Sequence, residues 1–179
     1  MVAKLVILDR DGTINADRDD YVKSADEFEP LPGALEAIAQ LNHAGVHVAV
    51  ATNQSGIARG LFDMEALNAI NTKMHKAVTQ AGGRIEAVFY CLDSAESNSP
   101  CRKPSPGMLL AMAERFNTSL QGTPAIGDSL RDLQAANAVG AQPYLVLTGK
   151  GRKTRKQGGL PEGTLVYADL AAVARDLLH

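Results

Sequence analysis

Residues 5–14, LVILDRDGTI, combine a short apolar run with two aspartates and a glycine. Leu5 to Leu8 has the composition of a buried strand, and Asp9 and Asp11 follow it immediately. Because residues two apart on a strand point to the same side, both carboxylates are expected to face one site. Neighbouring carboxylates repel each other and usually have a counter-ion or a chemical task. The alternative is a surface turn, in which Asp, Asp and Gly simply reverse the chain.

The rest of the chain alternates apolar, β-type runs with helical patterns. Further strands are predicted at Val46–Ala51, Ala87–Cys91, Pro124–Ile126, Tyr144–Leu147 and, more weakly, Thr164–Tyr167. Apolar residues at helical spacing predict helices around Leu35–Leu41, Leu67–Val78, Met108–Phe116, Leu130–Val139 and Leu170–Leu178. Near-continuous apolar strands that alternate with helices are typical of the α/β class, with a doubly wound, mostly parallel sheet. We expect one domain over residues 1–179.

Composition narrows the class of protein further. The net charge of −2 argues against a general nucleic-acid-binding face, which would be strongly basic. No apolar run approaches the ~20 residues that a membrane helix requires, and no signal peptide precedes Asp9. Two cysteines are too few for a disulfide framework and suit a reducing compartment. We therefore expect a cytoplasmic protein without a membrane partner.

Polar side chains gather where the predicted strands end, which is where open α/β sheets bind ligands. They are Asp9 and Asp11 after the first strand, Thr52–Ser55 after the second, CRKPSPG (101–107) after the third and GDSLRD (127–132) after the fourth. A carboxylate can attack phosphorus directly, and a second carboxyl can move the proton. Asp128 adds an oxygen ligand for Mg²⁺. Lys103 and the Thr52 hydroxyl provide donors for phosphoryl oxygens.

With these motifs in this order, the chain resembles the haloacid dehalogenase-like phosphatases. The motifs stand as DRDGT (9–13), Thr52, Lys103 and GDSLRD (127–132). The resemblance implies a Rossmann-like core, and the short segments between the motifs leave no room for a large cap domain. Four stretches together, ILDRDGTIN (7–15), TNQSGIARG (52–60), CRKPSPGM (101–108) and GDSLRDLQAA (127–136), are similar to those of members that remove the C7 phosphate of a heptose 1,7-bisphosphate. That reaction belongs to the biosynthesis of nucleotide-activated heptose for lipopolysaccharide. TNQSGIARG and CRKP are also shared with histidinol-phosphate phosphatases.

The resemblance also implies roles for individual residues. Asp9 would be the nucleophile and Asp11 the general acid and base. Asp9, the backbone carbonyl of Asp11, and Asp128 would hold Mg²⁺, while Thr52 and Lys103 would stabilise the transferring phosphoryl group. The implied substrate contacts are Asp17, Asp20, Tyr21, Asn53, Gln54, Ser55, Arg102 and Lys103. The implied partner is a small sugar bisphosphate, bound by a monomer.

Two departures from the family pattern change these expectations. Relatives usually carry a zinc loop, but here only Cys91 and Cys101 remain, with Asp93 and Ser99 in the other two positions. A structural Zn²⁺ needs four nitrogen or sulfur ligands, so no structural zinc is expected. The cysteines are expected to be free thiols, since cytoplasmic redox conditions oppose a disulfide. Ser129 stands where relatives often have a lysine, which removes one donor near the substrate.

Several alternatives stay open at this point. Asp132 is either a favourable charge at a helix N-terminus or a functional residue. The basic run 150–156 is a mobile solvated loop, or it raises the local concentration of a polyanionic substrate. Rival phosphatase substrates are histidinol phosphate and the 3′-phosphate ends of polynucleotides. A non-enzymatic receiver domain fits poorly, because its phosphorylated aspartate follows the third strand, where this chain has Cys91.

Overall fold

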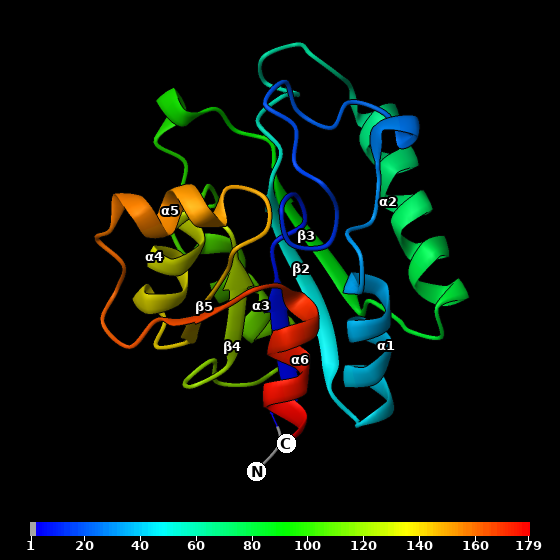
Figure 1. Cartoon of the computed structure of the whole chain (residues 1–179). Helices are drawn as coiled ribbons and strands as arrows, with labels where there is room; N and C mark the ends of the chain where they lie inside the picture. Colours follow the sequence, from blue (N-terminus) through cyan, green and yellow to red (C-terminus); the bar gives the residue numbers. More distant parts are fainter. Residues whose placement is uncertain (1–2) are drawn as a thin grey trace.

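The computed structural model describes residues 3–179, in which six strands form one sheet (Figure 1). The strands are β1 (Leu5–Leu8), β2 (His47–Asn53), β3 (Ala87–Cys91), β4 (Pro124–Gly127), β5 (Gln142–Val146) and β6 (Leu165–Tyr167). All neighbouring strands pair in parallel, in the order β3-β2-β1-β4-β5-β6. The predicted α/β class and parallel sheet are therefore confirmed.

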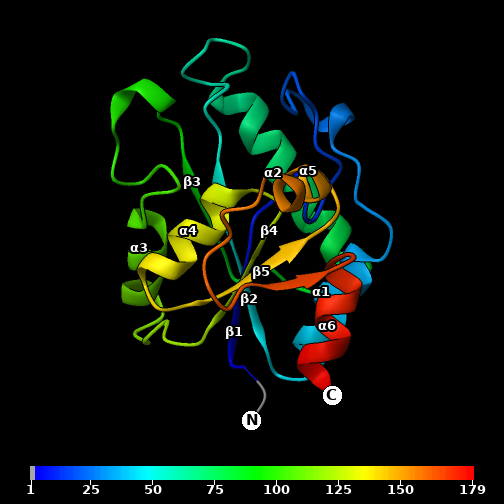
Figure 2. The ribbon, with the colours of Figure 1, turned by 60° about the vertical axis from the view of Figure 1, so that its left-hand side comes forward.

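Helices cover both faces of this sheet. They are α1 (Ala34–His43), α2 (Met64–Gln80), α3 (Gly107–Arg115), α4 (Leu130–Ala138), α5 (Gly151–Gln157) and α6 (Leu170–Leu178), with short 3-10 turns at Ala25–Glu27 and Ala95–Ser97. Figure 2 shows α3 and α4 on one side of the sheet and α1 and α6 on the other. Helices α1 and α2 pack into the core rather than forming a cap. Within residues 3–179, no helix is both long and apolar enough to cross a bilayer.

The central strand β1 explains why both faces are covered. All four of its residues are buried, and they alternate between two clusters of core side chains. Val6 and Leu8 belong to the cluster under α1, α2 and α6, whereas Leu5 and Ile7 belong to the cluster under α3 and α4. A strand buried on both faces needs apolar residues at every position, which is what residues 5–8 supply.

The strand order also places a crevice. From β1 the chain winds outward to β2 and β3, and it then returns to β4 and winds the other way. In open α/β sheets ligands bind at this switch point, beyond the carboxyl ends of the strands. The residues that follow β1 and β4, including Asp9 and Asp128, therefore meet at the crevice.

The basic run 150–156 is where the structure differs most from the predicted helices and strands. Residues 151–157 form helix α5, although a mobile loop was one of the two interpretations. The hydroxyl of Thr154 lies 2.7 Å from the carbonyl oxygen of Asp128 and 3.0 Å from that of Lys150, the N-cap of the helix. The hydrogen bond to Asp128 docks the helix against the end of β4. This segment lacks apolar residues at helical spacing, so its pattern could not reveal the helix.

Candidate active site

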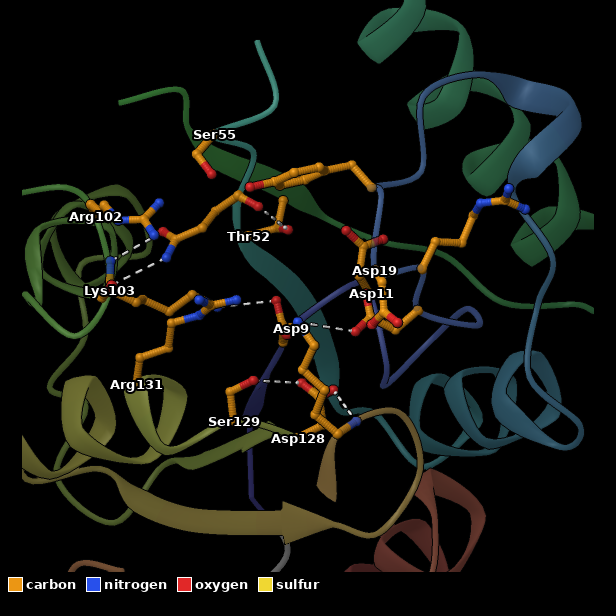
Figure 3. Close-up of a pocket in the computed structure, with 15 residues that line it drawn as sticks. Asp9, Asp11, Asp19, Thr52, Ser55, Arg102, Lys103, Asp128, Ser129 and Arg131 are labelled. Atoms are coloured by element: carbon orange, nitrogen blue, oxygen red, sulfur yellow. Dashed lines mark hydrogen bonds and ion pairs between the residues drawn. The ribbon is translucent and has the colours of Figure 1, made fainter. Parts of the chain in front are cut away.

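One pocket lies beyond the carboxyl ends of the strands, over the switch point between β1 and β4 (Figure 3). Segments at and after the ends of five strands, β1 to β5, contribute to it. Its lining residues are Asp9, Asp11, Asp17, Arg18, Asp19, Tyr21, Thr52, Asn53, Ser55, Arg102, Lys103, Asp128, Ser129, Arg131 and Lys150. Positive and negative side chains occur together here, as expected for a site that handles a charged group through oppositely charged contacts.

Lys103 is anchored at the floor of this pocket. The residue is only 4% exposed. The ammonium donates to Asp9 Oδ1 at 3.1 Å, to the Ala51 carbonyl at 2.8 Å and to Asp132 Oδ1 at 2.6 Å. Burial works against its charge, but the carboxylates of Asp132 and Asp9 outweigh burial and raise the pKa of Lys103. Lys103 therefore stays protonated beside Asp9.

The surroundings of Asp9 and Asp128 disfavour the charged forms of both carboxyl groups. Burial, followed by the charge of Asp132, raises the pKa of the Asp9 carboxyl well above its ordinary value, and Lys103 only partly opposes this. Burial and Asp132 likewise raise the pKa of Asp128 to about 6, although the backbone N–H of Lys150 opposes the rise. A divalent cation bound by these two carboxylates would lower both pKa values, since it favours the charged forms.

The oxygen donors fit Mg²⁺. Carboxylate oxygens of Asp9, Asp128 and Asp132 lie within 4.8 Å of one another. Both oxygens of Asp132 already have donors, Lys103 and the backbone N–H of Ser129. Within residues 3–179, by contrast, Asp9 Oδ2 accepts no hydrogen bond, and Asp128 Oδ1 accepts only one from the Ser129 hydroxyl at 3.3 Å. Asp9 and Asp128 are therefore the carboxylates better placed to bind a metal, which suits an ion that takes few protein carboxylates and keeps several waters.

Asp132 combines the two interpretations that the sequence left open. Its Oδ2 accepts the Ser129 N–H at 3.1 Å and closes a capping box at the start of α4. Its Oδ1 holds Lys103. The residue is thus both a helix cap and the group that positions the lysine of the pocket.

The Asp128 carboxylate sits in a tight backbone enclosure. Oδ2 accepts the Lys150 N–H at 2.8 Å, and Oδ1 accepts the Ser129 hydroxyl at 3.3 Å. A side chain on Gly12 or Gly149 would collide with this carboxylate, and both glycines have positive φ angles, +88° and +54°. The glycine after Asp11 therefore gives Asp128 room beside β1.

Asp11 is held by three side chains. Arg10, which is fully buried, donates from Nε to Asp11 Oδ1 at 3.0 Å and from Nη2 to Oδ2 at 3.2 Å. Asn15 donates to Oδ1 at 2.9 Å, and Gln54 to Oδ2 at 3.3 Å. Two-point contact with a guanidinium fixes the plane of a carboxylate. The roles of Arg10 and Asn15 were missed, although both residues flank Asp11 in the sequence.

The second strand contributes an anchoring residue for the Lys103 loop. The Asn53 side chain accepts the Lys103 N–H at 3.1 Å and donates to the Lys103 carbonyl at 3.2 Å. Thr52, which is 1% exposed, accepts a hydrogen bond from Gln54 at 2.9 Å. The end of β2 thus holds the backbone of residue 103 while its side chain reaches Asp9.

The structure brings most of the predicted site residues together. Those that line the pocket are Asp9, Asp11, Asp17, Tyr21, Thr52, Asn53, Ser55, Arg102, Lys103 and Asp128. Gln54 lies beneath it, where it contacts Asp11 and Thr52. Asp20 lies outside the pocket lining: it is exposed and pairs with Lys23 at 2.8 Å, while the neighbouring Asp19 lines the pocket. The pocket is also lined by Arg18, Asp19, Ser129, Arg131 and Lys150. Of these, Arg131 was missed, whereas Ser129 was expected near the substrate and Lys150 belongs to the basic run.

The cysteines are a correction, because free thiols were expected. Cys91 and Cys101 form a disulfide, with Cα atoms 5.7 Å apart, within the range that the bond allows. The expectation rested on compartment, whereas the loop after β3 turns back far enough for the two side chains to meet. Asp93 and Ser99 lie beside the sulfur atoms. Cys101, the second cysteine of the disulfide, directly precedes Arg102 and Lys103 in the sequence.

Comparisons with known proteins agree with this geometry. The family model described as "Polynucleotide kinase 3 phosphatase" matches residues 4–130, and the one described as HAD-hydrolase-like matches residues 100–173. The D-glycero-beta-D-manno-heptose-1,7-bisphosphate 7-phosphatase of Bordetella bronchiseptica is 58% identical over 98% of this chain and 98% of its own length. The protein of the same name from Pseudomonas aeruginosa is 51% identical over the full length of both chains.

Solved structures show the same similarity. The crystal structure of D,D-heptose 1,7-bisphosphate phosphatase from B. bronchiseptica, complexed with magnesium and phosphate, matches with a TM-score of 0.96, 58% identity and 98% coverage of each chain. The corresponding protein from Burkholderia thailandensis matches with a TM-score of 0.79, 56% identity and 98% coverage of each chain. This chain therefore belongs to the haloacid dehalogenase-like phosphatases, in the family of the D-glycero-beta-D-manno-heptose-1,7-bisphosphate 7-phosphatases.

Proposed function

We propose that this protein is a Mg²⁺-dependent phosphatase that removes the C7 phosphate of D-glycero-D-manno-heptose 1,7-bisphosphate through a phosphorylated Asp9. The observation that carries the proposal is the contact between Asp9 and the buried, protonated Lys103, with Asp128 and Asp11 beside them. The relatives named for this reaction, which match the chain almost end to end, support the substrate.

The reaction has two steps. In the first, an oxygen of Asp9 attacks the C7 phosphorus, and the bond from phosphorus to the sugar oxygen breaks. Asp11 gives its proton to the leaving alkoxide, which departs as the C7 hydroxyl. In the second, water attacks the phosphorus, Asp11 takes the proton back, and the bond from Asp9 breaks to release inorganic phosphate. Lys103 and the Thr52 hydroxyl contact the phosphoryl oxygens as their negative charge develops.

Asp9, Asp128 and the backbone carbonyl of Asp11 would hold the metal. Bound Mg²⁺ would supply positive charge to the phosphoryl group and keep Asp9 and Asp128 ionised. Arg10 and Gln54 hold the Asp11 carboxylate in one orientation, which fixes its position for proton transfer with the leaving oxygen. This matters because a general acid must lie within hydrogen-bond reach of the atom it protonates.

We further propose that the protein acts as a monomer in the cytoplasm and needs no structural zinc. A structural zinc site needs four nitrogen or sulfur ligands, whereas this loop offers only the two sulfur atoms of Cys91 and Cys101 when they are reduced, and neither when they form the disulfide. Among residues 3–179, the side chains that contact these sulfur atoms through oxygen are those of Asp93 and Ser99, which supply neither nitrogen nor sulfur. Metal analysis of the oxidised protein should give well under one zinc per chain. Stoichiometric zinc that survives dialysis would contradict this, and the same analysis after reduction would show whether the freed thiols bind it.

A phosphate-release screen tests the proposed substrate. The panel contains the heptose 1,7-bisphosphate, a hexose monophosphate, histidinol phosphate and a 3′-phosphorylated oligonucleotide, each with Mg²⁺ and with EDTA. We expect the bisphosphate to have the highest kcat/KM and EDTA to abolish turnover. The oligonucleotide is included because the polynucleotide phosphatase model matches residues 4–130. A higher kcat/KM with histidinol phosphate or the oligonucleotide would overturn the heptose assignment.

A further inference from the structure

Two of the five cationic side chains of the pocket have no carboxylate partner. Arg18, Lys103 and Lys150 each lie no more than 3.4 Å from an acidic side chain. Across residues 3–179, by contrast, Arg102 and Arg131 form no ion pair; Arg102 donates only to a backbone carbonyl, that of Asp93, at 3.3 Å. Unpaired arginines at the wall of a pocket are available to bind an anion.

The two arginines lie close to each other. In Figure 3, Arg102, Lys103 and Arg131 occupy one side of the pocket, while Asp11 and Asp19 occupy the other. Burial and then the positive charge of Arg131 lower the pKa of Arg102, so each guanidinium lies within the field of the other. Both also line an adjoining hollow, beside Pro104 and Ser105. Two like charges held together favour an anion between them.

We infer that Arg131, together with Arg102, forms the binding site for the second phosphate of the substrate, the one that is not transferred. The inference rests on the proposed function and names a specificity residue for it. The transferred phosphate belongs beside Asp9 and Lys103, whose ammonium is already shared among three oxygen atoms. A second phosphate on the same side of the pocket therefore meets the two free guanidinium groups, whose forked donors match phosphate oxygens.

Arg131 makes no hydrogen bond or ion pair with another side chain of residues 3–179, so no structural contact competes with this role. It is exposed and lies on the first turn of α4, whose capping box is made by Ser129 and Asp132. A positive charge near a helix N-terminus is slightly unfavourable for the helix. Replacing Arg131 should therefore leave the fold and the reacting centre intact.

The test compares two substrates that share the reacting phosphate. Wild type, Arg131→Gln and Arg131→Lys are assayed with the heptose 1,7-bisphosphate and with heptose 7-phosphate, which lacks the second phosphate. Arg115→Gln, at the exposed end of α3, removes the same charge outside the pocket and serves as the matched control. Urea unfolding of each variant checks that the fold is unchanged.

We expect Arg131→Gln to lower kcat/KM for the bisphosphate by roughly 10- to 100-fold, the size expected for a lost charge-assisted hydrogen bond, chiefly through KM. Turnover of the 7-phosphate should change less than about threefold, as should both substrates with Arg115→Gln. Arg131→Lys should recover part of the loss, because it keeps the charge but not the fork.

Two different results would overturn the inference, and they are distinguishable. If wild type prefers the bisphosphate but Arg131→Gln affects both substrates equally, the second phosphate does not bind at Arg131. If wild type shows no preference for the bisphosphate over the 7-phosphate, the pocket has no site for a second phosphate. The bisphosphate is then not the preferred substrate, which also contradicts the proposed function.

Discussion

Replacing Asp128 by Asn should stabilise the metal-free protein even though it removes a functional group. Burial and the neighbouring Asp132 raise the pKa of Asp128 from 3.8 to about 6, so its charged form is disfavoured in the folded chain. A pKa raised this far corresponds to a loss of up to about 3 kcal/mol at neutral pH. Asn has the same shape, and its amide can accept the Lys150 N–H and contact the Ser129 hydroxyl.

The pH dependence has a definite sign. Below the unfolded pKa of 3.8, Asp128 is protonated in both states and its titration contributes nothing. As the pH rises, the unfolded chain loses its proton first, so the wild-type protein loses stability until the folded pKa of about 6 is passed. The advantage of Asp128→Asn should therefore grow between about pH 4 and pH 6 and stay constant above this range.

Urea unfolding in EDTA at a series of pH values measures this effect. Asp26→Asn, at an exposed position outside the pocket, is the matched control and should stay within about 0.5 kcal/mol of wild type. Added Mg²⁺ should stabilise wild type more than Asp128→Asn, because the variant has lost one ligand. An Asp128→Asn protein less stable than wild type in EDTA at neutral pH, or a difference independent of pH, would refute the reasoning.

Three further substitutions test other parts of the site. Asp11→Asn should lower kcat by about 10²–10⁴-fold, the usual contribution of general acid–base catalysis, and an unchanged kcat would exclude Asp11 from that role. Arg10→Met should lower kcat by about tenfold or more and Arg10→Lys by less, because Arg10 orients Asp11 through charge-assisted hydrogen bonds; equal values for both would argue against this. Cys91→Ser should lower the free energy of unfolding by about 2–3 kcal/mol in oxidising buffer and by little in dithiothreitol, since the disulfide spans 10 residues.

The parts of the site that the sequence predicted are those that regular strands control. Asp9 and Asp128 each follow a short apolar strand of a parallel sheet, and such strands end at one edge. Their meeting could be inferred without knowing any distance. Lys103 and Thr52 were found through the order of the motifs. They follow the third and second strands, whose carboxyl ends lie at the same edge of the sheet as Asp9 and Asp128.

The features of the site that could not be predicted depend on loops and on side-chain contacts, which leave no periodic pattern in the sequence. Asp19 and Asp20 stand in an irregular loop, where no periodicity decides which side chain faces the pocket. Arg10 is fully buried, against the general tendency of arginine, because its charge is neutralised by Asp11. The Cys91–Cys101 bond depends on how the loop after β3 turns back, and spacing in the sequence does not show this.

The covalent intermediate on Asp9 is tested most directly by trapping it. The protein is mixed with heptose 1,7-bisphosphate and Mg²⁺, quenched in acid within the first turnover, and reduced with borohydride, which converts an acyl phosphate to an alcohol. Peptide mass spectrometry should find homoserine at position 9 only when substrate was present, and Asp9→Asn should show neither the product nor turnover. An unmodified Asp9 in protein that turns over normally, or turnover by Asp9→Asn, would contradict nucleophilic attack by this residue.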